Sequence, residues 1–361
     1  MNRTTIFSPY IEFAKLRSSS RFNLATSGIM SYPLSELPVT IDRLEINGPD
    51  AYGYQPLVER LAAKNKVAPE CVVSINGGTS LANNVAIAGT TEPGDHVLAE
   101  TPGYEVLDTA ARFLGLEVGQ FQRRPEEGFR LDPREIERRL TPRTRLIVIT
   151  NLHNPSGVLA DDNTLRLIGD IARSAGARVL VDEVYLDMAY DQTPSSSFHL
   201  DPKTFVVTNS LTKAYGLSGL RCGWILAEPG LAERLWRIHD LYAVNPVHVA
   251  ELLSVIALDN LGKIADRART LLEKNRALLN RFFDSCADLE IVRPEFGTVA
   301  FPRLRQGTVE KLFTVLRDKY ETTVVPGKFF AAPQHFRVGV GGDTEMTREA
   351  LDRLASALRE V

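Results

Sequence analysis

The sequence predicts an α/β fold: a large domain with a mainly parallel central sheet flanked by helices, and a smaller α+β domain made from both chain ends. Apolar strand-like runs alternate with helical patterns over residues 71–210. Such alternation is typical of βαβ units, whose parallel strands are covered on both faces. After Pro229 the pattern changes to long helices followed by short strands. We therefore expect an N-terminal arm at 1–42, a large domain at 43–260 and a small domain at 261–361.

The large domain is expected to begin with a turn at Asn47-Gly48-Pro49 and to contain strands separated by helices. The predicted strands are short apolar runs, at residues 71–75, 96–100, 145–150, 177–183 and 205–210. The predicted helices have apolar residues at helical spacing, at residues 51–65, 79–89, 104–114 and 162–175.

The remainder of the chain favours a different arrangement. Helices are predicted at residues 231–243, 247–260, 263–283 and 346–361. Short strands are predicted at residues 289–292, 298–302, 322–325 and 336–340. The 263–283 helix is long and amphipathic, so we expect it to join the two domains. Before residue 43 only 9–16 favours a helix, and this arm therefore needs a later domain to pack against.

The composition is that of a globular protein and excludes several functional classes. Of 361 residues, 44% are hydrophobic and 24% charged, with a formal charge of −3, so no basic face for nucleic acid is expected. The segments RRPEE (123–127) and REIERR (134–139) mix signs and predict solvated surface. Three well-separated cysteines argue against disulfides and a cysteine-based metal site. No apolar run approaches the ~20 residues of a membrane span. We expect a soluble, cytoplasmic protein.

The segment 206–224 carries the clearest chemical pattern. An apolar run leads to Ser210-Leu211-Thr212-Lys213, and Arg221 follows eight residues after the lysine. Apolar neighbours would favour a neutral, nucleophilic amine, and a hydroxyl with a guanidinium fork suits a phosphate dianion. An amine that can form a Schiff base beside a phosphate clamp suggests pyridoxal phosphate (PLP). The alternative is a strand-loop-strand with an ordinary surface lysine.

Polar residues also follow four other predicted strands. These residues are Gly78-Thr79-Ser80, Tyr104, Asn154, and the pair Asp182 and Tyr185. The carboxyl ends of parallel strands meet at one edge of a sheet, so these side chains would converge on one crevice. Residues 78–80 lie between a strand and a helix, where free amides can bind phosphate. The alternative for 78–80 is an ordinary turn with a threonine cap.

In this order and spacing the motifs resemble those of the class I/II aminotransferases, the aspartate-aminotransferase-like fold-type-I PLP enzymes. The ordered set is Asn-Pro-x-Gly at 154–157, Asp-x-x-Tyr at 182–185, and Ser-x-x-Lys at 210–213 followed by Arg221. The resemblance covers roughly residues 47–341. It implies a PLP enzyme that transfers the amino group of an L-amino acid to a 2-oxo acid by ping-pong chemistry through pyridoxamine phosphate.

The resemblance also implies roles for single residues. Lys213 would hold PLP as a Schiff base and later move a proton at the substrate Cα. Asp182 would keep the pyridine nitrogen protonated, unless it is a helix N-cap. Tyr185 and Asn154 would bond the phenolic oxygen, although Asn154 could be only a turn residue before proline. Tyr104 would stack on the ring, with packing in the core as the alternative.

The remaining implied roles concern the phosphate and the substrate. A phosphate cup would be formed by Gly78, Thr79, Ser80, Ser210 and Arg221. Arg337 would grip the substrate α-carboxylate beside Asn154, because a planar fork matches a carboxylate. An exposed ion-pair arginine is the alternative for Arg337.

Two positions depart from the family pattern, and both lie where specificity is usually set. Gly48 stands where many relatives have a tyrosine that reaches the partner subunit's phosphate, so Tyr52 is a substitute candidate. The family's substrate-contacting glycine falls at Ser27 or Gly28. The resemblance further implies a homodimer with sites at the subunit interface.

Two rival functions remain open at this point. A PLP-dependent lyase that eliminates at a carbon–sulfur bond would share every cofactor residue, so the motifs do not separate it from a transaminase. A non-catalytic regulator built on a PLP domain would usually carry a DNA-binding extension. Residues 1–42 show neither a helix-turn-helix pattern nor excess positive charge, which disfavours the regulator.

Overall fold

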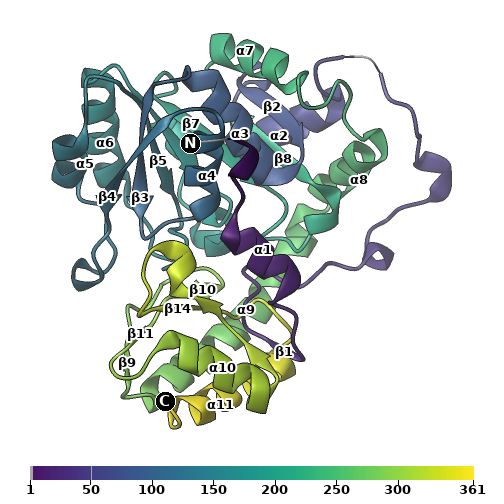
Figure 1. Cartoon of the computed structure of the whole chain (residues 1–361). Coiled ribbons are helices and arrows are strands. Elements are labelled where there is room, and N and C mark those ends of the chain that lie inside the picture. Colours follow the sequence, from purple (N-terminus) through teal and green to yellow (C-terminus); the bar gives the residue numbers. More distant parts are fainter. Residues whose placement is uncertain (1–2, 50) are drawn as a thin grey trace.

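The structure is a computed structural model that describes residues 3–49 and 51–361. Residues 1, 2 and 50 lie outside it, so the predicted arm is followed from Arg3. The chain forms a large part with a seven-stranded sheet and a smaller part that holds the C-terminus (Figure 1). This arrangement confirms the predicted fold class, while the exact boundaries at 42 and 260 stay a prediction.

The central sheet is parallel except for one strand, which runs antiparallel to both of its neighbours. In spatial order its strands are β2 (Val72–Asn76), β8 (Cys222–Leu226), β7 (Phe205–Ser210), β6 (Arg178–Asp182), β5 (Thr144–Thr150), β3 (His96–Thr101) and β4 (Glu117–Gln122). The antiparallel strand is β8. Strands β4 and β8 were not predicted. The first is a polar edge strand in which only Phe121 is fully buried, and Gly223 interrupts the apolar run of the second.

Helices cover both faces of this sheet, and neighbouring strand residues alternate between two apolar cores. One core holds α3 (Gly78–Thr90), α4 (Glu105–Phe113) and α7 (Pro229–His239). The other core holds α2 (Gln55–Asn65), α5 (Pro133–Arg139), α6 (Asp162–Ser174) and α8 (His248–Asp259). Both faces of each inner strand are therefore dry, as expected of a parallel sheet.

The prediction of solvated surface for the two mixed-charge segments was wrong in part. Arg123 is fully buried, and Glu135 on α5 is only 5% exposed. Sign alternation indicates that charges can pair, but it does not say on which side of the backbone each side chain lies. In the first segment one charge pairs inside the protein.

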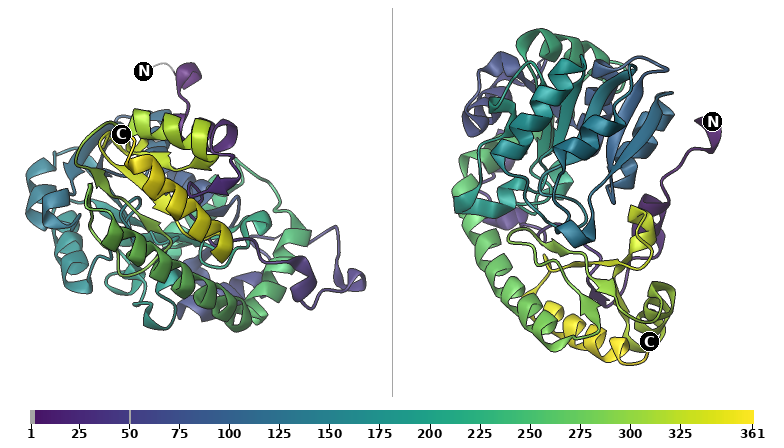
Figure 2. Two further views of the ribbon diagram at one scale, coloured as in Figure 1. Left: turned by 90° about the horizontal axis from the view of Figure 1, so that it is seen from below. Right: turned by 90° about the vertical axis from the view of Figure 1, so that its left-hand side faces the viewer.

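The smaller part is built from both chain ends, as predicted. Its helices are α9 (Leu261–Ser285), α10 (Val309–Tyr320) and α11 (Thr344–Leu358), of which α10 was not predicted. Its strand groups are β1 (Phe22–Asn23) with β12 (Thr322–Thr323), β10 (Val299–Ala300) with β14 (Phe336–Gly339) and β13 (Val325–Pro326), and β9 (Leu289–Glu290) with β11 (Arg303–Leu304). Helix α9 runs from the large part along the smaller one (Figure 2, right).

The arm is held against the C-terminal strands by close backbone contacts. The Gly339 amide donates to the Leu24 carbonyl at 2.7 Å. A Cβ at Gly339 would lie 1.9 Å from the Thr26 carbonyl oxygen, and one at Gly341 would lie 2.0 Å from that of Gly28. Only glycine permits this approach. The contacts fix residues 24–28, and α1 (Pro9–Leu16) lies where the two parts meet (Figure 1).

Short 3₁₀ helices complete the fold, at Arg3–Thr5, Leu34–Glu36, Ile41–Arg43, Pro69–Cys71, Pro125–Glu127, Leu186–Gln192, Ser197–His199, Ser218–Leu220 and Gly327–Phe330. Among the helices of residues 3–49 and 51–361, none has the length and apolar character needed to cross a membrane.

Candidate active site

A pocket of about 220 Å³ lies at the carboxyl ends of the central strands. Predicted residues that line it are Thr79, Ser80, Tyr104, Asn154, Asp182, Tyr185, Ser210, Lys213 and Arg221. The convergence expected from five strand ends is therefore found. A larger groove of about 580 Å³ between α1 and α10 contains none of these residues. The chemistry of its lining, rather than its size, marks the smaller pocket as the site.

Lys213 lies on the loop after β7, with its amine directed at Ser27 from the arm. The Lys213 Nζ donates to Ser27 Oγ at 3.1 Å, and the Tyr185 hydroxyl donates to the same oxygen at 2.9 Å. Ser27 lines the pocket, whereas Gly28 packs on the lysine, since a Cβ there would lie 3.3 Å from Lys213 Cδ. The serine side chain is therefore the one that faces the pocket.

Asp182, at the end of β6, is a buried carboxyl that is 2% exposed. Burial raises its pKa to about 6, although hydrogen bonds from Asn83 and the Val184 amide and the charge of Lys213 oppose the shift. Asn83 donates from Nδ2 to Asp182 Oδ2 at 2.8 Å, while Thr208 donates to Asn83 Oδ1. The amide orientation is thus fixed. A positively charged partner in the pocket, such as a protonated ring nitrogen, would stabilise this carboxylate.

The predicted phosphate cup is assembled where β2 ends and α3 begins. Thr79 donates to Ser210 Oγ at 2.8 Å, and the Gly78 amide donates to the Arg221 carbonyl at 2.8 Å. Gly78 has φ +68°, and a Cβ there would lie 2.6 Å from Arg221 Nη2, so glycine is required. Thr212 lines the pocket, and its buried hydroxyl has no partner in the described chain. A helix N-terminus, hydroxyls and a guanidinium fit the phosphate of PLP.

Arg337, on β14, is 1% exposed and is held by groups from three other segments. Its Nη1 donates to Asn154 Oδ1 at 2.9 Å, and its Nη2 donates to the Tyr10 hydroxyl at 2.8 Å and to the Ala25 carbonyl at 3.2 Å. None of these partners is a carboxylate, and its Nε has no partner in the described chain. A buried, unpaired guanidinium beside a pocket is suited to an anionic ligand.

Tyr104 presents its ring to the pocket from the N-cap position of α4. The ring of Tyr10 meets it edge to face, with centroids 5.8 Å apart and planes at 82°. Burial opposes ionisation of Tyr10, yet the charges of Arg337 and Lys213 lower its pKa overall. The stacking role of Tyr104 on the cofactor stays a prediction.

Four predicted site residues do not line the pocket: Gly28, Tyr52, Gly78 and Arg337. Gly28, Gly78 and Arg337 contact lining residues, namely Lys213, Arg221 and Asn154, whereas Tyr52 lies away from the pocket. Its side chain is 60% exposed, and its hydroxyl donates to Asp240 at 3.2 Å. Its role toward a partner subunit stays a prediction.

Sequence reasoning missed Tyr10, Asn83 and Thr150, all of which line the pocket. Asn83 had a signal, because it follows Thr79 by four residues and so shares a helix face with it. Tyr10 had none, because it belongs to an arm whose position depends on contacts with strands some 300 residues later in the sequence.

An amine, a buried carboxyl and an anion cradle at the carboxyl edge of a parallel sheet define the site of a PLP-dependent enzyme. The model of the family "Aminotransferase class I and II" matches residues 43–354. The chain is 28% identical to capreomycidine synthase of Streptomyces vinaceus, over 94% of this chain and 90% of that protein. It is also 28% identical to a probable aspartate/prephenate aminotransferase of Thermus aquaticus, over 84% and 81%.

A solved structure agrees with these matches. A PLP-dependent aminotransferase from Streptococcus suis superimposes with a TM-score of 0.92 at 25% identity, covering 99% of this chain and 98% of that one. The chain belongs to the class I and II aminotransferase family. It is a PLP-dependent aminotransferase.

The raised pKa of Asp182 predicts a stability effect in the PLP-free protein. The folded state holds this proton up to about pH 6, whereas the unfolded chain releases it near 3.8, so the contribution of Asp182 to stability falls as pH rises from about 4 to 6. Asp182→Asn should therefore raise the free energy of unfolding at pH 7.5 by roughly 1–3 kcal/mol and change it little at pH 3.5. Denaturant unfolding of both proteins measures this difference in free energy. If Asp182→Asn is no more stable than the unsubstituted protein at pH 7.5, the raised pKa of Asp182 is contradicted.

Proposed function

We propose that this chain transfers the amino group of an L-amino acid to a 2-oxo acid, with Lys213 as the reacting amine and Arg337 as the carboxylate-binding residue. The observation that carries this proposal is the buried Arg337 guanidinium. It has no carboxylate partner in residues 3–49 and 51–361, and it bonds Asn154, which lines the pocket that contains Lys213. Both substrates carry an α-carboxylate, and both must therefore be oriented in the same way.

Each residue of the site has a task in this proposal. Bound PLP supplies an electron sink that stabilises negative charge at the substrate Cα. Arg337 would orient the carboxylate so that the Cα–H bond faces Lys213, whose Nζ would take the proton from Cα and deliver it to C4′ of the cofactor. Asp182 holds a proton on the ring nitrogen, and Asn154, with Oδ1 engaged by Arg337, retains its Nδ2–H as a donor to the phenolic oxygen. Tyr185 keeps its hydroxyl beside the lysine amine.

The pocket also bears on the substrate class. Its cationic lining side chains in the described chain are Lys213 and Arg221, and both have tasks in cofactor binding. A side-chain carboxylate would consequently need a cation from the partner subunit. We leave the amino donor open among L-amino acids for that reason.

Removing the reacting amine tests the proposal most simply. Lys213→Ala should abolish the covalent attachment of PLP that borohydride traps, and should lower turnover by roughly 10³-fold or more. The surface variant Lys203→Ala should change neither. Trapping and turnover are measured on both purified variants. Normal transamination by Lys213→Ala would refute the assignment.

The carboxylate role of Arg337 predicts a selective loss. Arg337→Gln should lower kcat/KM for α-amino acids by roughly 10²- to 10³-fold, because an ion pair in a desolvated site is lost. An amine without a carboxylate should be affected far less, and the visible band of bound PLP should persist. Steady-state kinetics with matched substrate pairs decide this. Equal losses for both substrates would speak against the role.

We further propose a homodimer in which the partner completes the site. Large apolar side chains are 58–87% exposed on residues 41–48 and on the segment before α8, at Ile41, Ile46, Leu241, Val244 and Val247. These two segments adjoin, since a Cβ at Gly48 would touch His248. Arg221, a residue of the phosphate cup, is also exposed. Exposed apolar surface of this kind is typical of an interface between subunits.

If the partner subunit completes the site, loss of the dimer should be accompanied by weaker retention of PLP. Light scattering should give twice the chain mass of 40.0 kDa. The double variant Leu241→Glu/Val244→Glu should shift the mass toward the monomer and weaken PLP retention, because buried charges oppose association. Leu167→Glu, at an exposed leucine on α6, is the control and should remain dimeric. A double variant that stays dimeric would contradict the proposed surface.

The rival lyase reading, and a reducing cytoplasmic location, stay predictions. A lyase would release ammonia and a 2-oxo acid from one amino acid without an acceptor. Product analysis therefore separates it from the transaminase.

A further inference from the structure

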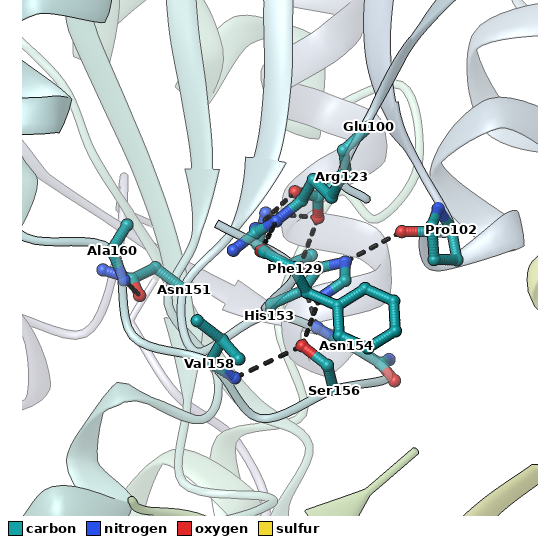
Figure 3. Close-up of polar contacts among 11 residues, drawn as sticks. Glu100, Pro102, Arg123, Phe129, Asn151, His153, Asn154, Ser156, Val158 and Ala160 are labelled. Atoms are coloured by element: carbon teal, nitrogen blue, oxygen red, sulfur yellow. Dashed lines mark hydrogen bonds and ion pairs between the residues drawn. The ribbon is translucent and has the colours of Figure 1, made fainter. Parts of the chain in front are cut away.

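A buried polar network lies beneath the pocket, and none of the roles above uses it. Glu100 at the end of β3 and Arg123 after β4 form an ion pair of 2.8 Å, with side-chain exposures of 2% and 0% (Figure 3). Arg123 Nε also donates to the Phe129 carbonyl at 2.7 Å. Burying two charges is unfavourable unless further hydrogen bonds accompany the pair. Arg123 pairs with Oε2 of Glu100, so Oε1 of the same carboxylate is free to accept further hydrogen bonds.

Glu100 Oε1 accepts both donors of one residue, Thr150 at the end of β5. The Thr150 amide donates to it at 2.8 Å and the Thr150 hydroxyl at 2.5 Å. The hydroxyl proton is therefore committed to the carboxylate, and the oxygen lone pair is left as an acceptor. The backbone amide of Asn154 donates to that oxygen at 2.9 Å. One chain of bonds thus runs from Arg123 through Glu100 and Thr150 to Asn154.

Asn154 transmits this arrangement to the pocket. Its backbone is held by Thr150 and its Oδ1 by Arg337, so the direction of its remaining Nδ2–H is set from both ends. In the proposed site that donor faces the phenolic oxygen of PLP.

His153 ties the same loop to the segment that carries Tyr104. The Pro102 carbonyl can only accept, so His153 Nε2–H donates to it at 2.8 Å, and Nδ1 accepts from the Ser156 hydroxyl at 2.6 Å (Figure 3). Burial and the charge of Arg123 lower the pKa of His153 well below its usual value. The ring is therefore neutral and keeps this tautomer. The loops of Asn154 and Tyr104 are joined beneath the pocket.

We propose that Glu100, Arg123 and Thr150 are positioning residues that direct the side-chain amide of Asn154 toward the cofactor. In this way they set the proton affinity of the nitrogen that joins Lys213 to the cofactor. This inference rests on the PLP site and on the place of Asn154 within it. A donor to the phenolic oxygen stabilises negative charge there, which makes that oxygen a weaker partner for the proton on the lysine–cofactor nitrogen. A misdirected Asn154 should therefore let that nitrogen hold its proton to higher pH.

The test is a pH titration of the visible band of PLP bound to Lys213. Thr150→Val removes the hydroxyl at nearly constant volume and should move the titration midpoint upward by about one pH unit, the equivalent of one lost hydrogen bond to a charged group. Thr150→Ser keeps the hydroxyl and should restore the midpoint. Glu100→Gln should shift it in the same direction. The Thr150 and Glu100 variants are expected to act through the side-chain amide of Asn154. The double variant Asn154→Ala/Thr150→Val should therefore shift the titration midpoint no further than Asn154→Ala alone.

A matched control separates positioning from simple loss of stability. Glu183 is likewise buried and accepts from the amide and hydroxyl of one residue, Ser197, at 2.8 and 2.7 Å, but Ser197 does not line the pocket. Glu183→Gln can change the melting temperature of the PLP-free protein in either direction, but it should leave the midpoint unchanged. If Thr150→Val and Glu100→Gln lower only the melting temperature, or if the double variant is additive, the inference is overturned. Absence of any band in the unsubstituted protein would overturn the cofactor assignment as well.

Discussion

The architecture depends on one buried cation, Arg337. Its guanidinium lies out of water with no carboxylate partner among the described residues. It is held by dipoles from α1, the arm and the loop after β5, and it lies over the rings of Tyr10 and Phe330. These segments come from both chain ends and from the central sheet, so the charge can be accommodated only when the two parts of the chain are joined. The close backbone passage at Gly339 and Gly341 holds the arm at Thr26 and Gly28 against the C-terminal strands. A carboxylate ligand would relieve the electrostatic cost, which gives substrate binding its driving force.

Other polar groups of the pocket are also buried without a full set of partners. Asp182 is buried with a pKa raised to about 6, and the Thr212 hydroxyl has no partner in the described chain. Groups arranged in this way lower the stability of the protein alone and become favourable once a ligand supplies the complementary charge. The rigid sheet tolerates that arrangement because its two apolar cores are closed on both faces. Rigidity at the strand ends is in turn what gives the site its geometry.

Much of this could be predicted from the sequence, and the limits are physical. Lys213, Asp182 and Asn154 were found because a parallel sheet brings its strand ends to one edge. Tyr10 was missed because its position is set by contacts between distant chain ends. The Glu100–Arg123 pair was missed because mixed charge was taken to indicate solvent exposure, although Arg123 is fully buried. Local patterns specify which elements form, whereas pairing between elements decides which polar groups are buried.

The central claim is that Lys213 supports transfer of the α-amino group of a substrate whose α-carboxylate is bound by Arg337. The most direct measurement is the visible spectrum of the PLP-loaded protein during titration with a panel of L-amino acids. The account predicts that the band of lysine-bound PLP is replaced by that of the amino form of the cofactor, with one 2-oxo acid released per site, and that a 2-oxo acid restores the first band. Release of ammonia and a 2-oxo acid with the band retained would contradict amino transfer and identify a lyase.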